Sequence, residues 1–194
     1  MIPVIPIAIS ARHVHLTQAT LDVLFGPGHV LQVKSPLSQP GQFAAIETVA
    51  LVGPRGRVDA VRVLGPPRAA DQVELSRSDE IALGIDAPLR VSGDLEQTPG
   101  IELVGPAGRV RLDHGVLTPL RHIHMSPEDA QRFGVHDREF VSVAVNSHGR
   151  DLVFGDVVIR VSPKFRLELH LDTDEGNAAG VDHGATASLM RLER

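Results

Sequence analysis

The sequence predicts a mainly β protein built from two similar small β-barrels with a few short α-helices. Segments rich in Val, Ile and Leu recur along the 194 residues, and 18 Gly and 14 Pro punctuate them. Short strands between regular turn signals are typical of β-sandwiches and β-barrels. The clearest turns are GPRG at 53–56 and GPAG at 105–108, each inside an expected hairpin. We expect strands at 47–52, 58–64, 73–75, 101–104, 141–145, 157–161 and 167–171.

Two short helices are expected from their end signals. One follows Thr17 as N-cap and ends at Gly26. The other follows Ser126 as N-cap, has Pro127 in its first position and ends at Gly134.

The chain contains an internal repeat of two separated blocks. The first block is RHVHLT at 12–17 and RHIHMS at 121–126, each followed by a short helix that ends in Phe-Gly. The second block has two β-segments and an acidic pair, at 61–63, 73–75 and 79–80 in one copy and at 159–161, 169–171 and 174–175 in the other. Two blocks in the same order predict two barrels related by a pseudo-twofold axis. We set the first domain at 12–93 and the second at 94–194.

Composition excludes several classes of protein. The chain has no Cys, which excludes disulfides, thiolate metal sites and a cysteine nucleophile. A net charge of −5 and the absence of Trp and Tyr argue against nucleic-acid binding. No apolar run is long enough to span a membrane. The opening MIPVIPIAIS reads as a strand, not a signal peptide, and with no Cys it favours the cytoplasm.

Two His-x-His pairs indicate metal binding. Side chains at i and i+2 of a strand point to the same face, so His13 and His15 project together, as do His122 and His124. Imidazole is a good ligand for zinc and related metals. One such pair alone fits the polar face of an edge strand equally well, and the repetition favours a metal.

The repeat supplies a third candidate ligand to each pair. When the two copies are aligned, Glu74 falls opposite His170. Two His with a carboxylate, and three His, are both ligand sets of catalytic zinc sites with an open position. The competing interpretations are a solvent-facing strand residue for Glu74 and a polar strand face for His170.

Other polar residues receive simpler interpretations. Arg68, in a rigid Gly-Pro-Pro-Arg loop, is a candidate clamp for a phosphate or carboxylate, and Arg160 is a weaker one. Arg12 and Arg121 are expected to form structural ion pairs. We expect a solvated acidic turn at 172–175 and surface positions for the remaining histidines, His29, His114, His136, His148 and His183.

Six segments together resemble the phosphate acyltransferases (phosphotransacylases, or phosphate propanoyltransferases) of bacterial microcompartments, which serve propanediol degradation. They are SARHVHLT, SQPGQFAAIETV, VLGPPRAADQVELSRSDEIALGI, PLRVSGDL, LRHIHMSPEDA and LELHLDTDEGNAA. The resemblance implies interconversion of a short-chain acyl-CoA (propionyl or acetyl) plus phosphate with acyl phosphate plus CoA. It also implies two β-barrels with two zinc ions, the second barrel being joined by the strand at 1–11.

The resemblance assigns site residues by their motifs. It implies six zinc ligands, His13, His15, Glu74, His122, His124 and His170. It makes Arg68 the phosphate-binding residue and places Gln39, Gln72, Ser92 and Arg160 at other polar active-site positions. We expect metal-assisted direct transfer, with Arg68, Arg160, Gln72 and Ser92 as the catalytic set.

Partners and location follow from the same resemblance. We expect a homodimer that uses acyl-CoA and phosphate, in the cytoplasm or inside a microcompartment. Members of microcompartments usually carry an amphipathic extension before the first strand, and here that strand begins almost at Met1. The alternatives are a metal-dependent acyl-CoA thioesterase and a zinc-stabilised β-barrel binding module.

Overall fold

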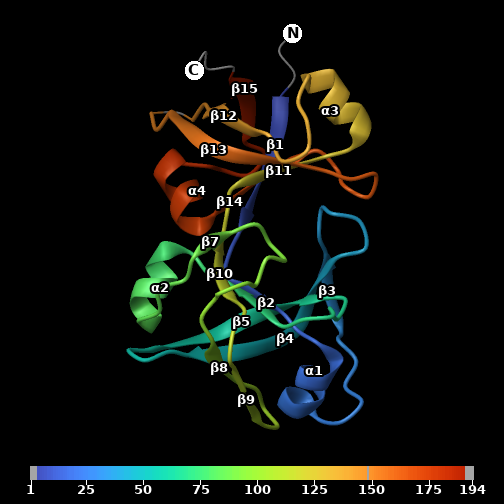
Figure 1. Cartoon of the computed structure of the whole chain (residues 1–194), viewed down its shortest axis with the longest axis vertical. Coiled ribbons are helices and arrows are strands. Elements are labelled where there is room, and N and C mark those ends of the chain that lie inside the picture. Colours follow the sequence, from blue (N-terminus) through green and yellow to red (C-terminus); the bar gives the residue numbers. More distant parts are fainter. Residues whose placement is uncertain (1–3, 148, 191–194) are drawn as a thin grey trace. The chain divides into compact units, whose positions relative to one another are not determined.

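The computed structural model describes residues 4–147 and 149–190. The protein is mainly β, with 43% of residues in strands and 16% in helices, which confirms the predicted fold class. The described residues form two compact units. We call residues 11–119 the first unit, and residues 4–10 with 120–190 the second unit. Figure 1 labels the elements of both.

The first unit holds a nine-stranded, curled sheet of order β7-β10-β6-β2-β5-β4-β8-β9, with β3 paired to β4. Its strands are β2 (His13–His15), β3 (Val33–Pro36), β4 (Phe43–Val52), β5 (Arg57–Gly65), β6 (Gln72–Glu74), β7 (Leu89–Arg90), β8 (Ile101–Val104), β9 (Arg109–Leu112) and β10 (Val116–Pro119). Its helices are α1 (Gln18–Phe25) and α2 (Arg77–Leu83).

The second unit is a closed six-stranded barrel of order β1-β14-β11-β13-β12-β15. Its strands are β1 (Val4–Ser10), β11 (His122–Met125), β12 (Phe140–Val145), β13 (Leu152–Val161), β14 (Glu168–Asp172) and β15 (Thr186–Met190). Its helices are α3 (Pro127–Phe133) and α4 (Thr173–Ala179).

The internal repeat is visible in the strand order. The run β6-β2-β5-β4 of the first unit corresponds to β14-β11-β13-β12 of the second. In both runs the His-x-His strand pairs antiparallel with the strand of the third candidate ligand (β6 or β14). On its other side it pairs parallel with β5 or β13. Because the strands have the same order and the same directions, the surroundings of the His-x-His strand are alike in the two units.

Each His-x-His strand is preceded in the chain by a strand that pairs within the other unit. β1 precedes β2 but pairs parallel with β14 and antiparallel with β15. β10 precedes β11 but pairs parallel with β6. The two compact units divide the chain after Ser10 and after Pro119. The reason is that β8 and β10, within residues 94–119, complete the sheet of the first unit through β4 and β6.

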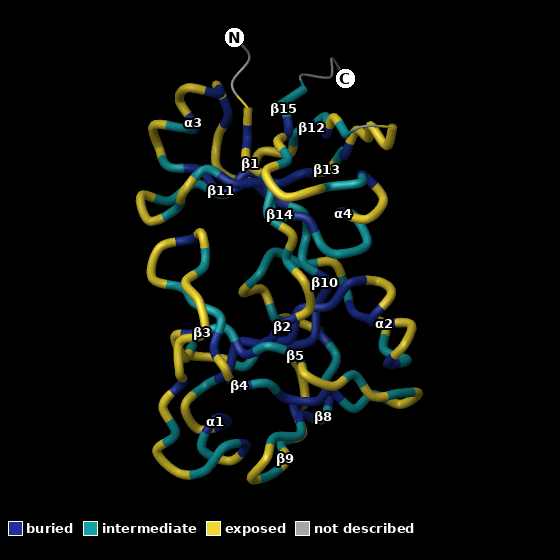
Figure 2. The backbone as a smooth tube through the Cα atoms, turned by 180° about the vertical axis from the view of Figure 1, so that it is seen from behind, coloured by how far each residue is buried: buried dark blue, intermediate teal, exposed yellow. Residues whose placement is uncertain are grey.

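Each unit has its own apolar core. One cluster of fully buried side chains includes Val14, Leu21 and Leu103, and the other includes Ile5 and Ile123. Figure 2 shows buried residues along β11 and exposed residues in many of the turns. The His-x-His strands thus lie inside packed sheets, and not at a solvated edge.

The expected helix ends are confirmed. Thr17 accepts a hydrogen bond from the Thr20 amide, and α1 ends at Gly26. Ser126 caps α3, which ends at Gly134. Two further helices, α2 and α4, were not expected. Each begins with a capping box, in which the N-cap side chain and the acidic side chain three residues later bind each other's backbone amides.

Candidate metal centre

The first cluster of candidate ligands consists of His13, His15 and Glu74, all buried in the first unit. One ligand atom from each residue lies within 4.8 Å of the others. The cause is strand pairing, because His13 of β2 lies directly across from Glu74 of β6. His15 points to the same face as His13, two residues along the strand.

The second cluster consists of His122, His124 and His170, and it repeats the first in the second unit. Its ligand atoms also lie within 4.8 Å of one another. His122 of β11 lies across from His170 of β14, which is the register of His13 and Glu74. The structure therefore brings together both sets of three residues that the sequence singles out.

Backbone carbonyl groups orient the first histidine of each cluster. His13 Nδ1 donates to the Ala11 carbonyl at 2.9 Å, and His122 Nδ1 donates to the Leu120 carbonyl at 2.8 Å. These bonds fix the tautomer and direct the other ring nitrogen, Nε2, into the cluster. In a metal-bound histidine, the ring nitrogen that does not bind the metal usually donates such a hydrogen bond.

Buried nitrogen atoms without a hydrogen-bond partner point to a ligand that completes each cluster. Within residues 4–147 and 149–190, these atoms include His15 Nδ1, His124 Nδ1 and His170 Nε2. The last lies 2.9 Å from the Glu168 carboxylate, a contact with the distance of an ion pair but without hydrogen-bond geometry. Buried polar groups are normally paired, and a metal ion satisfies a ring nitrogen as a lone-pair acceptor.

The second histidine of each pair is held in the neutral form that binds metal. Burial lowers the pKa of His15 to about 3, with further lowering by the neighbouring His13 and Arg68. Burial lowers the pKa of His124 to about 2, with further lowering by His122 and His170. Because a metal ligand must present a free lone pair, neutral imidazoles suit this role.

Gln72 and Ser92 lie around the Glu74 carboxylate. Gln72 Nε2 donates to Glu74 Oε1 at 2.5 Å, and Ser92 Oγ donates to the same oxygen at 2.8 Å. The Gly93 amide in turn donates to Gln72 Oε1 at 2.9 Å. These contacts engage Oε1 and leave Glu74 Oε2 facing His13 Nε2, at 3.4 Å. Both residues therefore contact the candidate ligand itself.

One arginine accompanies each cluster. Arg68 follows β5 in the first unit, and its charge contributes to the lowered pKa of His15. Arg160 of β13 lies across from His124 and lowers the pKa of that histidine in the same way. A guanidinium beside a metal site is suited to bind an oxyanion. Gln39 is buried in the loop between β3 and β4.

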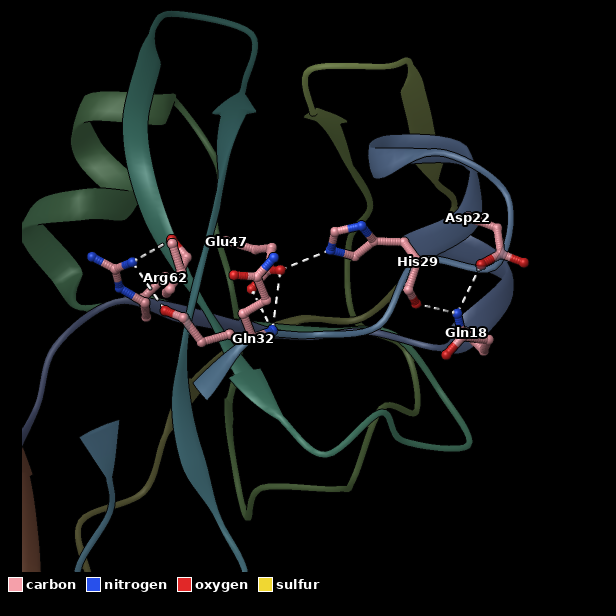
Figure 3. Close-up of polar contacts among 8 residues, drawn as sticks. Gln18, Asp22, His29, Gln32, Glu47 and Arg62 are labelled. Atoms are coloured by element: carbon pink, nitrogen blue, oxygen red, sulfur yellow. Dashed lines mark hydrogen bonds and ion pairs between the residues drawn. The ribbon is translucent and has the colours of Figure 1, made fainter. Parts of the chain in front are cut away.

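Of the remaining histidines, three are exposed and one is partly exposed with a defined partner. His114, His136 and His183 are exposed, as expected, and His148 lies outside the described residues. His29 is partly exposed, and its Nε2 lies 2.7 Å from the carboxylate of Glu47 on β4. Figure 3 shows this contact together with the Gln32 amide, which donates to the same carboxylate at 3.2 Å. The pair holds the loop after α1 against β4.

The acidic turn expected at 172–175 is the start of helix α4. The Asp172 carboxylate accepts from the Glu175 amide at 2.8 Å, and the Glu175 carboxylate accepts from the Asp172 amide at 3.0 Å. Burial raises the pKa of both carboxyl groups. The pattern Asp-x-x-Glu is a capping-box signal that was present in the sequence.

Sequence reasoning also missed Glu168. It lies across from His124, at the place that Gln72 occupies across from His15. Its buried carboxylate contacts His170, as Gln72 contacts Glu74. The repeat alignment carried this signal, because positions 72 and 168 precede the third candidate ligands by two residues.

Membrane helices are not found: within the described residues, none of the helices has the length and apolar character needed to cross a bilayer.

Fold and clusters together define a mainly β protein with two repeat-related sets of three candidate metal ligands. Three protein ligands is the number found in catalytic zinc sites, whereas structural sites are closed by four.

Comparison with known sequences identifies the family. The sequence profile of phosphate propanoyltransferases matches residues 6–182. A phosphate propanoyltransferase of Thermotoga maritima is 52% identical over 182 residues, covering 94% of this chain and 87% of the relative. One of Salmonella typhimurium is 53% identical over 179 residues, covering 92% and 85%. One of Shewanella putrefaciens is 51% identical over 191 residues, covering 98% and 90%. The chain belongs to the phosphate propanoyltransferase family, a family of acyltransferases.

Proposed function

We propose that this chain is a phosphate acyltransferase that interconverts a short-chain acyl-CoA plus phosphate with an acyl phosphate plus CoA, with propionyl-CoA or acetyl-CoA as substrate. The observation that carries the proposal is a complete pair of three-ligand clusters in a chain that matches the family from residue 6 to residue 182. The names of the relatives, phosphate propanoyltransferases, support the propanoyl group as the acyl group that is transferred.

Each cluster is proposed to hold one zinc ion. The donors fit, because neutral imidazole nitrogens and one carboxylate oxygen are ordinary zinc ligands. The buried nitrogens of His15 and His124 that have no hydrogen-bond partner within the described residues support this assignment. When bound, zinc in such a site supplies Lewis-acid stabilisation of a negative charge that develops on sulfur or oxygen.

Arg68 is proposed to bind and orient the phosphate, and Arg160 is proposed as a second candidate for binding phosphate. In the forward direction a phosphate oxygen attacks the thioester carbonyl carbon, a C–O bond forms, and the C–S bond breaks to release CoA thiolate. Arg68 offers a planar set of N–H donors that matches two phosphate oxygens. Arg160 offers the same group in the second unit. Because phosphate is already nucleophilic near neutral pH, its orientation is a main part of catalysis.

Gln72 and Ser92 are proposed to act through Glu74. Both donate to Glu74 Oε1, so they hold the carboxylate with its other oxygen directed at the cluster. Gln39 is proposed as a further polar residue of the active site on the basis of the family motif. A homodimeric state and a location in the cytoplasm or in a microcompartment stay predictions from the resemblance.

Release of free thiol from acyl-CoA tests the proposed function directly. The purified protein, with its metal content measured, is incubated with propionyl-CoA or acetyl-CoA in the presence and absence of phosphate. We expect thiol release only with phosphate, loss of release on chelation, and recovery with zinc. Release without phosphate would identify a thioesterase. No release by a zinc-loaded protein would favour a binding module.

A further inference from the structure

An arginine–carboxylate pair recurs at the same place beside both clusters. Arg12 Nε lies 2.6 Å from Asp79 Oδ1, and Arg121 Nε lies 2.7 Å from Glu175 Oε1. Each arginine directly precedes the first histidine of its cluster, and each acid follows the third candidate ligand by five residues. The same guanidinium atom makes the same contact in both units. The pair is therefore part of the repeat.

The second oxygen of each carboxylate binds the chain just after the third candidate ligand. Asp79 Oδ2 accepts from the Ser76 amide at 3.2 Å, and Ser76 lies two residues after Glu74. Glu175 Oε2 accepts from the Asp172 amide at 3.0 Å, and Asp172 lies two residues after His170. One carboxylate thus bridges the start of the His-x-His strand and the end of its partner strand.

This bridge lies where the strand pairing is short. β2 and β6 pair over only three residues, and β11 and β14 over three as well. In both cases the strands are antiparallel, so the start of one lies beside the end of the other. The bridge closes that open end, next to the facing candidate ligands. It thereby limits relative movement of the two strands that supply one cluster.

Burial gives the bridge its strength. The side chain of Asp79 is 6% exposed and that of Glu175 is 18% exposed, so both carboxylates depend on nearby donors. Arg12 is 45% exposed, which makes it the easier residue to replace without a cavity. Arg121 has further contacts, because it donates to the Gly155 carbonyl at 3.1 Å and lies over the Phe154 ring.

We propose that Arg12 and Arg121 are positioning residues, each of which slows the release of the metal ion held by its own cluster. This inference rests on the proposed function, in which each cluster holds one zinc ion. Neither arginine belongs to a group of candidate metal ligands. The two arginines act through the carboxylate bridge, which holds the two strands that carry the ligands at the spacing of a paired sheet. Groups that orient metal ligands change metal affinity by about 10–100-fold when removed.

The experiment measures zinc release to an excess of a colorimetric chelator from the full chain loaded with zinc. Arg12→Gln removes the charge and keeps a polar side chain, and Arg12→Lys is the conservative variant. We expect Arg12→Gln to speed the release of one of the two ions by about tenfold and to leave the other unchanged. Arg12→Lys should restore part of the slow release. Arg121→Gln should speed the release of the other ion.

Two single-site backgrounds assign the ions. His122→Ala keeps only the first cluster complete, and His13→Ala keeps only the second. Arg12→Gln should act in the first background and not in the second, and Arg121→Gln should show the reverse. Native mass spectrometry of the full chain counts the ions that stay bound, and Arg12→Gln should lose one ion and keep the other.

Two control variants separate positioning from loss of stability. Arg57→Gln removes an exposed ion pair with Asp59 in the first unit and should leave zinc release unchanged. Val49→Ala weakens the core of the first unit on β4. For the same loss of stability, it should speed zinc release less than Arg12→Gln does. Equal effects of the two, or equal acceleration of both ions by Arg12→Gln, would overturn the inference.

The outcome also distinguishes the inference from the proposed function. Two tightly held ions in both the wild-type chain and Arg12→Gln would overturn the inference and leave the metal centres in place. A wild-type chain that binds no zinc would overturn the metal centres, and the inference with them.

Discussion

His13 lies directly across from Glu74 on paired strands, with 3.4 Å between His13 Nε2 and Glu74 Oε2. The equivalent register in the second unit places His122 across from His170, with the two rings stacked at 4.9 Å. One cluster thus contains a carboxylate and the other only imidazoles. The two candidate centres share the same strand register and differ in the charge of their ligands.

Loss of one candidate ligand should empty one centre. We expect His122→Ala to lower the zinc content by about half and to abolish turnover, because two ligands hold zinc far more weakly than three. Metal analysis and the thiol assay measure the two effects. His136→Ala changes an exposed histidine and is the control. A His122→Ala protein with full zinc and full activity would contradict the assignment.

Arg68→Ala should weaken the use of phosphate. We expect kcat/KM for phosphate to fall by about 10²–10⁴-fold, since a lost donor to a reacting oxyanion has an effect of this order. KM for the acyl-CoA should change little. Steady-state rates at varied phosphate measure the effect, and Arg109→Ala, an exposed arginine of β9, is the control. Unchanged phosphate kinetics would remove Arg68 from the site.

Ser92→Ala tests whether Ser92 acts through Glu74. Removal of the hydroxyl group takes away one of the two donors to Glu74 Oε1, so we expect zinc affinity of the first cluster to fall by about 10–100-fold. Activity should recover at high zinc concentration. Zinc titration followed by the thiol assay measures both. Full zinc binding with no activity at any zinc concentration would instead show that Ser92 acts on the substrate and not through Glu74.

Direct transfer predicts a ternary complex of protein, acyl-CoA and phosphate. The chain has no cysteine to form a thioester, and the Ser92 hydroxyl group donates its hydrogen bond to Glu74 Oε1. Initial rates at varied concentrations of both substrates should give intersecting lines in a double-reciprocal plot. Acyl-CoA labelled in the acyl group should leave no label on the protein. Parallel lines with retained label would indicate an acyl-enzyme.

Ile5→Ala tests the placement of β1 in the barrel of the second unit. Ile5 is fully buried and pairs with β15, so its truncation should lower the free energy of unfolding by about 2–5 kcal/mol. Val4→Ala, on the exposed face of the same strand, should have little effect. Denaturant unfolding measures both. Equal small effects would place β1 outside the core.

The candidate ligands could be predicted because their signal is local. A strand alternates its faces every residue, so His13 and His15 must share a face, and the second copy repeated the pattern. Glu74 and His170 required the repeat alignment, since nothing near them in the sequence marks a ligand. The structure then showed that strand register brings both to their histidines.

Non-local pairing was harder to predict. β10 pairs with β6 and lies in the same compact unit, residues 11–119. This pairing could not be predicted, because the choice of partner between distant strands leaves no period in the sequence. The contact between His29 and Glu47 likewise joins segments that no pattern relates. By contrast, the capping boxes of α2 and α4 were visible as Ser-x-x-Asp and Asp-x-x-Glu and could have been found.

Phosphorus NMR of the reaction mixture tests the central claim most directly. The zinc-loaded protein is mixed with propionyl-CoA and phosphate, and the acyl phosphate signal is compared with the amount of free thiol. The account predicts one acyl phosphate for each thiol released, and neither product after chelation. Thiol release with no acyl phosphate, or equal yields from the metal-free protein, would contradict it.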